Sequence, residues 1–340
     1  MNPGTPRLAK GEAMKTIWFG LLGVVTAIAA TAFGPRPAAA AETITMVTTG
    51  KGSAQQWPIF IALAKGYMAE NGVALDMVAA PSSAAAVQQL SAGSANLESG
   101  GLTDPLLAID KGAKIAVLRV ETQVAPYSLW AKSAIKSIAE LRGKLISIGG
   151  AKDITRIYLE RTLIPNGVQP GQYDTIFAGT TAARFAALSS GAVDASLLIP
   201  PFSFKAKSVG LTYLASVADY ARDLPFTGYA TNIAWATTHK PLLLGFLGAM
   251  AKGVDWFYQD ANRDEAVDIL VKQSGLSRAD VEATYDYYRQ LRVFDHRGAI
   301  ESETVGNLIK AMQQMDDFDG PRDVSRFVTP EITGLAAQVK

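Results

Sequence analysis

Two stretches of the chain decide the fold: APSSAAAVQQLSAG at residues 80–93 and AGTTAARFAALSSG at residues 178–191. Aligned end to end, they share three alanines, a leucine, a serine and the closing glycine, and paired hydroxyl residues occupy the same positions in both. Upstream of each, the tripeptide Asn-Gly-Val recurs, at 71–73 and at 166–168. The recurrence of these features in one order indicates a duplicated unit.

Each unit alternates strand and helix patterns. Two-residue alternation predicts strands and three-to-four-residue spacing predicts helices. The first unit reads as strand 43–48, a helix from Pro58, strand 75–78 and helix 84–90, and the second as strand 145–148, helix 154–163, strand 173–177 and helix 182–188. Strands interleaved with helices imply an α/β fold with mostly parallel sheets covered on both faces.

Two such units predict two lobes. Residues 123–127 are a candidate crossover and residues 228–236 a candidate return strand, and after Pro241 the pattern is almost wholly helical. If the chain returns to the first lobe at residues 228–236, the helical segment after Pro241 belongs to that lobe. The expected division is therefore lobe 1 at 42–124 and 235–340, and lobe 2 at 125–234.

Residues 1–41 have the three parts of a secretory signal. Lys15 precedes an uncharged run, glycine and proline break it, and alanines lead to Glu42, so we expect cleavage between Ala41 and Glu42. An uncleaved anchor stays open as the alternative, as does a start at Met14 instead of Met1. The lack of cysteine excludes a lipid anchor there, and no twin-arginine pair is present. The expected product is a periplasmic protein that is not anchored in the membrane.

Composition excludes several classes of site. The 340 residues include no cysteine and two histidines, and the formal net charge is +1. A thiol nucleophile and cysteine-based metal sites are therefore impossible, and a nucleic-acid partner is not expected because no excess of basic residues is present. No phosphate-binding lysine motif or G-x-S-x-G elbow occurs, and His239 and His296 stand in charged stretches without partners nearby in sequence. We predict neither a metal nor a cofactor.

The carboxyl ends of the expected strands lead into loops rich in Gly, Ser, Thr and Gln, where open sheets bind small molecules. Two interpretations stay open for several residues. The hydroxyls of Ser82, Ser83, Thr180 and Thr181 suit both helix capping and ligand contact. Trp57 suits both a hydrophobic staple and ligand stacking. Arg156, in a first helical turn where a cation is unfavourable, indicates either an anion in the cleft or a solvated surface arginine.

Several phrases together resemble one protein family. They are W-P-x-F-x-A-x-A-K-G-Y at 57–67, L-S-A-G-S-A-N at 90–96 followed by S-G-G-L-T-D-P, E-L-R-G-K at 140–144, and A-A-L-x-S-G-x-V-D-A at 186–195. The order of these phrases resembles the solute-binding proteins of ABC importers, in the subgroup that takes nitrate, sulfonate, taurine and thiamine precursors. The Cys-rich motif of related pyrimidine synthases is absent.

The resemblance implies a type 2 periplasmic binding protein with two lobes, mixed and mostly parallel sheets flanked by helices, and a helical C-terminal region. It implies a monomer without enzymatic activity that closes on a small organic solute, anionic or aromatic, and delivers it to an ABC permease and its ATPase. The matching loops place near that solute Gln55, Gln56, Trp57, Ser82, Ser83, Leu102, Thr103, Thr155, Arg156, Thr180 and Pro200.

Two other functions fit the same lobes. One is an exported lyase or dehydratase, for which Asp104 and Asp153 are the candidate acid–base groups. The other is a ligand-sensing subunit that docks on a membrane histidine kinase.

Overall fold

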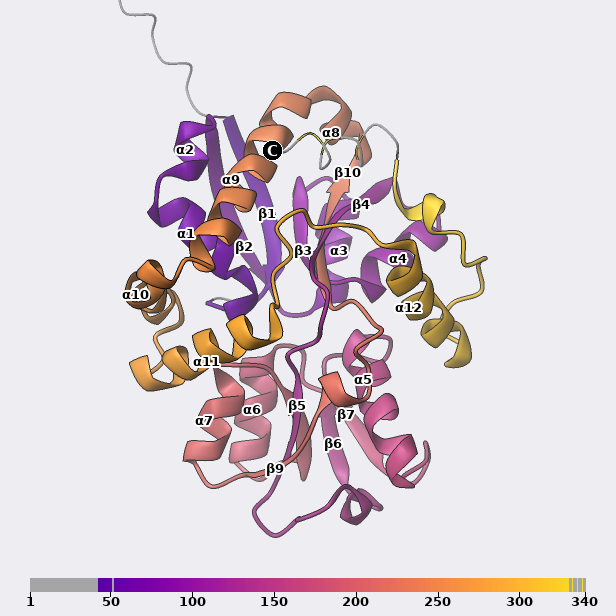
Figure 1. Ribbon diagram of the computed structural model, residues 1–340. Helices are drawn as coiled ribbons and strands as arrows, with labels where there is room; N and C mark the ends of the chain where they lie inside the picture. Colours follow the sequence, from indigo (N-terminus) through magenta and orange to yellow (C-terminus); the bar gives the residue numbers. More distant parts are fainter. Residues whose placement is uncertain (1–41, 51, 330–331, 333–334, 336–337, 339–340) are drawn as a thin grey trace, which may run out of the picture. The chain divides into compact units, whose positions relative to one another are not determined.

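The computed structural model describes residues 42–50, 52–329, 332, 335 and 338 (Figure 1). The expected signal peptide, residues 1–41, lies outside these residues. The strands form two five-stranded sheets, ordered β2-β1-β3-β10-β4 and β7-β6-β8-β5-β9. Their bounds are β1 (Glu42–Thr49), β2 (Val73–Ala80), β3 (Leu97–Gly101), β4 (Ile115–Thr122), β5 (Ser128–Ala131), β6 (Leu145–Ile148), β7 (Asp174–Phe177), β8 (Ala195–Leu198), β9 (Thr212–Ser216) and β10 (Thr227–Asn232).

The helices connect and cover these strands. Their bounds are α1 (Trp57–Ala64), α2 (Tyr67–Glu70), α3 (Ser83–Ser91), α4 (Thr103–Asp110), α5 (Ile154–Leu163), α6 (Thr181–Ser189), α7 (Phe202–Ser208), α8 (Ile233–Thr238), α9 (Lys240–Phe257), α10 (Arg263–Ser274), α11 (Arg278–Leu291) and α12 (Ser302–Gln314). Short 3-10 turns precede α1 at Ala54–Gln56 and follow α12 at Val324–Phe327. Among the described residues, none of the helices combines the length and the apolar character needed to cross a bilayer.

The two sheets repeat one topology. In the first, β1 lies between β2 and β3 and is parallel to both, and in the second β6 lies in the same way between β7 and β8. Each parallel trio is extended by one antiparallel strand, β10 in one sheet and β5 in the other. An edge strand, β4 or β9, pairs antiparallel with that strand and so runs in the direction of the trio. The quoted stretches fold as equivalent helices, α3 and α6, each linking an outer strand to an inner one. The mixed, mostly parallel α/β fold expected from the sequence is confirmed.

Alternation along the inner strands buries both faces of the second sheet. Leu197 belongs to the hydrophobic cluster that includes α5, whereas Leu198 belongs to the cluster that includes α6. Leu129 and Trp130 divide in the same way, because successive strand residues point to opposite faces. Helices α6 and α7 lie on one side of this sheet and α5 on the other (Figure 1).

The C-terminal helices pack on elements of the first sheet. Helix α9 shares a core with β1, and α10 and α11 share another with α1. Strand β10 pairs with β3 and β4, so the chain has returned to the first sheet by Thr227. We therefore propose a two-lobe division whose second boundary lies before Thr227, rather than after residue 234 as the sequence suggested. The sequence pattern located the return strand but not its partners.

Gly253 marks a close approach of α1 and α9. A Cβ atom at this position would lie 2.5 Å from the carbonyl oxygen of Pro58, a backbone atom that a side-chain rotation cannot move away. We expect Gly253→Ala to lower the free energy of unfolding by about 1–3 kcal/mol, the usual effect of overpacking. Denaturant unfolding of the purified protein measures it.

Gly306 provides the matched control. It lies inside α12, and a Cβ there meets no heavy atom within 4 Å. Gly306→Ala should therefore raise the free energy of unfolding by about 0.5–1 kcal/mol through helix propensity alone. Equal effects of the two substitutions would contradict the close packing of α1 on α9.

Candidate functional site

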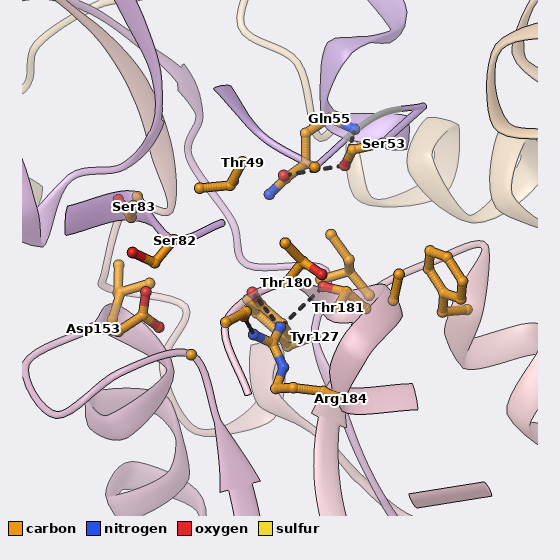
Figure 2. Close-up of a pocket in the computed structure, with 18 of the residues that line it drawn as sticks. Thr49, Ser53, Gln55, Ser82, Ser83, Tyr127, Asp153, Thr180, Thr181 and Arg184 are labelled. Carbon is orange, nitrogen blue, oxygen red and sulfur yellow. Dashed lines mark hydrogen bonds between the residues drawn. The ribbon is translucent and has the colours of Figure 1, made fainter. Parts of the chain in front are cut away.

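A cleft between the two sheets collects the loops that follow their parallel strands. Figure 2 shows Ser53 and Gln55 on one side, Tyr127, Thr180, Thr181 and Arg184 opposite, and Ser82, Ser83 and Asp153 at one end. The cleft is lined by Thr49, Gly50, Ser53, Gln55, Ser82, Ser83, Gly101, Tyr127, Gly149, Asp153, Ile154, Gly179, Thr180, Thr181, Ala182, Arg184, Ile199, Pro200, Pro201, Phe202 and Phe226.

Three of the helices that begin at this cleft have a side-chain cap. The Oγ of Ser82 accepts a hydrogen bond from the backbone N–H of Ala85 at 3.2 Å, which caps α3. Thr180 caps α6 with the same geometry, through the N–H of Ala183 at 3.2 Å. The capping interpretation of both residues is thus confirmed. Helix N-termini carry partial positive charge and free N–H groups, so they favour a negatively charged group beside them.

Asp153 caps the third helix, α5, and shapes the loop before it. Its Oδ1 accepts hydrogen bonds from the backbone N–H and from the hydroxyl of Thr155. The Oγ1 of Thr155 in turn accepts the N–H of Gly149 at 2.8 Å, which holds the end of β6 against the helix start. Thr155 is therefore a buried structural residue of the cleft wall, whereas the carboxylate of Asp153 faces the cleft.

Arg184 places a buried positive charge on the side of the cleft formed by the second sheet and its helices. Its side chain is 2% exposed, and it donates to the carbonyls of Leu197 and Gly179, at 3.0 Å for Leu197. Its Nη2 also donates to the hydroxyls of Thr181 at 2.9 Å and Tyr127 at 3.2 Å. All of these partners are neutral, and no carboxylate within the described part of the chain forms an ion pair with the guanidinium. Its charge is therefore held in place without being neutralised.

Tyr127, the residue directly before β5, contacts Arg184. Its ring contacts Tyr158 and Phe226, and the guanidinium of Arg184 lies 5.7 Å from the ring centroid. Burial raises the pKa of the Tyr127 phenol, although Arg184 partly offsets this. The phenol is therefore a neutral group that orients the arginine.

The side of the cleft formed by the first sheet carries one buried and one partly buried acid. Glu98 on β3 is 0% exposed, and burial, with a contribution from Asp104, raises its pKa well above the usual value. Asp104, at the start of α4, has a pKa of about 7, raised by burial and then by Asp153, while the nearby Ser83 hydroxyl lowers it. Asp104 and Asp153 both line a second part of the cleft, which also includes Ser82, Ser83 and Gly149.

Five of the eleven predicted site residues line the cleft of Figure 2. They are Gln55, Ser82, Ser83, Thr180 and Pro200. Four others, Gln56, Leu102, Thr103 and Thr155, are buried behind the cleft surface. Gln56 donates a hydrogen bond from its Nε2 to the Oγ1 of Thr48, and Leu102 belongs to the hydrophobic core. Thr103 is fully buried, and Thr155 supports the loop described above. Ligand contact by the five residues that line the cleft stays a prediction.

The structure contradicts the ligand interpretations of Trp57 and Arg156. Trp57 is fully buried among Phe257, Tyr285 and Tyr288, far along the chain, so its ring packs the core and does not face a ligand. Arg156 pairs with Asp317 at 3.0 Å and with Glu160 at 3.3 Å and does not line the cleft. The anion that balances Arg156 comes from the protein itself.

Sequence reasoning missed Arg184, although the sequence carries a signal for it. Arg184 lies four residues before Leu188, beside Phe185, on the buried face of α6. In the aligned repeat its counterpart is Ala86. An arginine on the apolar face of an amphipathic helix is unusual and indicates a specific partner.

The chain has clear matches among known families and folds. The family model described as NMT1/THI5 like matches residues 53–266. The nitrate-binding protein NrtA from Synechocystis PCC 6803 superimposes with a TM-score of 0.73 at 14% identity, covering 87% of this chain and 88% of that one. The alkanesulfonate-binding protein SsuA from Xanthomonas axonopodis pv. citri, bound to MOPS, gives 0.70 at 17%, covering 86% and 99%.

A third structure is the ligand-binding component of an ABC-type import system from Staphylococcus aureus, with zinc bound. It gives a TM-score of 0.73 at 15% identity and covers 88% of this chain and 99% of that one. The comparison with curated proteins finds no match. At these identities the structures establish a shared fold. Within the described residues, no group of three or more His, Asp or Glu side chains is placed to hold a metal ion.

Proposed function

The chain belongs to the NMT1/THI5-like family, and on this premise we propose that it is the substrate-binding component of an ABC importer. It captures a small organic solute with an anionic group between its two lobes. The solute-binding proteins of known structure described above support this role, because the fold of this chain covers 88–99% of their length.

Arg184 is the observation that carries the proposal. A guanidinium buried among neutral partners is costly to desolvate unless an opposite charge joins it. The N-termini of α3 and α6 lie at the same cleft and add favourable interactions with a negative group. A sulfonate, carboxylate or similar oxyanion of the solute supplies the missing charge and accepts these hydrogen bonds.

Delivery of the captured solute to the permease requires a change in the arrangement of the two lobes. The solute contacts both lobes and so favours their closed arrangement, which the permease recognises. No bond in the solute is made or broken. A periplasmic location, a monomeric state and an ATPase that supplies the energy complete the proposal, and the expected signal peptide at residues 1–41 supports export.

A thermal-unfolding panel tests the proposal. Purified protein spanning residues 42–340 is heated with sulfonates, nitrate, aromatic acids, pyrimidines and amino acids, and the solute is then recovered and identified by mass spectrometry. A solute at 100 times its Kd should stabilise the protein by about 2.7 kcal/mol. We expect stabilisation by an anionic solute that is recovered unchanged. A solute that is chemically consumed, or stabilisation by neutral solutes alone, would overturn the proposal.

A further inference from the structure

Two buried glutamates of the first sheet, on the two strands that flank β10, differ in one respect. Glu121 on β4 lies 2.8 Å from Nη2 of Arg119, and both side chains are 2% exposed. Glu98 on β3 is equally buried, and the carboxylate oxygens of both glutamates lack a hydrogen-bond partner within the described residues, but no basic side chain there forms an ion pair with Glu98. The protein supplies a cation for one buried acid and not for the other.

The residues near Glu98 add further carboxyl groups and no cation. Asp104 adds a second carboxyl group, whose Oδ2 is also buried without a partner, and Asp153 adds a third. Among the residues that the structure describes, no lysine, arginine or histidine pairs with Glu98 or Asp104. Carboxyl groups gathered in this way disfavour ionisation unless a positive charge joins them.

These acids adjoin the solute cleft. The part of the cleft that Asp104 lines and the part that Arg184 lines are continuous, because they share Ser82, Ser83, Gly149, Asp153 and Gly179. Ser83 lines both parts, and its Oγ and the Oε1 of Glu98 both lie close to Gly100. The one basic side chain among the residues of the acidic part, Lys152, pairs with Asp317 at 3.5 Å. The cleft thus has a cationic end and an acidic end.

We propose that the acidic end is a subsite for an ammonium group, formed by Asp104 and Asp153 with Glu98 behind them, so that the cleft selects solutes carrying both an anion and an amine. This inference rests on the proposed function, because Arg184 holds the anion of the same solute. The ammonium group supplies the cation that the buried acids lack, and its N–H groups donate to the carboxylates.

Matched solutes test the subsite by isothermal titration calorimetry. The probes are ω-amino alkanesulfonates and ω-amino carboxylates with two to five carbons, each compared with the unsubstituted anion of equal length. We expect the best amino compound to bind at least about tenfold more tightly than its counterpart, as a charged hydrogen bond of 1.4 kcal/mol or more implies. Tighter binding of the unsubstituted anion would overturn the subsite and leave the proposed function standing. Binding by no anion in either series would contradict both.

An Asp104→Asn variant locates the ammonium group. It should weaken the amino compound about tenfold and leave the unsubstituted anion unchanged or more tightly bound. Asp76→Asn removes an exposed carboxylate from β2 in the same lobe and controls for long-range charge effects. If Asp104→Asn fails to fold, Glu98→Gln replaces it, with a smaller loss expected in the same direction. Equal loss for both solutes in the folded variants would assign Asp104 and Glu98 a structural role instead.

The pH dependence of the binding affinity distinguishes ligand contact by Asp104 from a structural role, because a structural role would not make the affinity for the amino compound depend on pH. Asp104 has a pKa of about 7. The titratable or polar groups around it are Glu98 on β3, Asp153 before α5, Ser83 on α3 and Lys152, and Tyr229 on β10 lies near Glu98. An ammonium group favours the ionised carboxylate, so affinity for the amino compound should rise about tenfold from pH 6 to pH 8, while its amine stays protonated. The unsubstituted anion should show no rise. Parallel profiles for the two would contradict the subsite.

Discussion

An Arg184→Gln variant is expected to bind anionic solutes about 10- to 150-fold more weakly than the wild-type protein. Hydrogen bonds to charged groups contribute about 1.5–3 kcal/mol, and glutamine removes the charge together with most of the donors. The guanidinium is 2% exposed and all four of its hydrogen-bond partners are neutral, so the solute is the group that loses its counter-charge. Calorimetric titration with the sulfonates and carboxylates of the thermal panel measures the loss.

Two further arginine variants separate binding from folding. Arg184 also links Leu197 on β8 to the loop before α6, so its replacement is expected to lower stability as well. Arg184→Lys keeps the charge and should retain part of the affinity that glutamine loses. Arg156→Gln removes a guanidinium of equal charge from α5, where it pairs with Glu160 and Asp317, and should leave affinity unchanged. A folded Arg184→Gln protein with unchanged affinity would refute the role of Arg184.

The two sheets were predictable in outline because the duplicated unit leaves a local pattern. The alternation at 43–48 and 145–148 and the caps at Ser82 and Thr180 depend on nearby residues, and the structure confirms them. The order of strands within each sheet depends on which distant strands pair. Nothing near Thr227 in the sequence says that β10 joins β3 and β4.

The site was predictable where its geometry is local. Ser82 and Thr180 line the cleft because a helix begins there, and the sequence marks that position with a capping residue. Residues whose surroundings come from far along the chain were misassigned. Arg156 meets Asp317, and the acids at the cleft gather from β3, α4 and the loop before α5. Such contacts arise from tertiary packing, which spacing along a single sequence does not encode.

Trp57 is the second position where a large effect is expected, and the effect is on stability. Its indole is 0% exposed, and Nε1 donates to the carbonyl of Ala266 at 2.8 Å. Its ring centroid lies 5.1 Å from that of Phe257 and 5.7 Å from that of Tyr285, both in edge-to-face contact. Trp57→Ala should therefore lower the free energy of unfolding by about 3–5 kcal/mol, because it leaves a cavity where α1, α9 and α11 meet.

The neighbouring residue Gln55 separates this core role from ligand contact. Gln55 lines the cleft from within the short 3-10 turn Ala54–Gln56, whereas Trp57, directly after that turn, is buried in the core. Gln55→Ala should weaken solute binding, by about 0.5–1.5 kcal/mol for a neutral hydrogen bond, with little change in thermal stability. Trp57→Phe keeps an aromatic ring in the core and should lower thermal stability without changing solute affinity. A folded Trp57→Phe protein that loses affinity would contradict a role for Trp57 in stability alone.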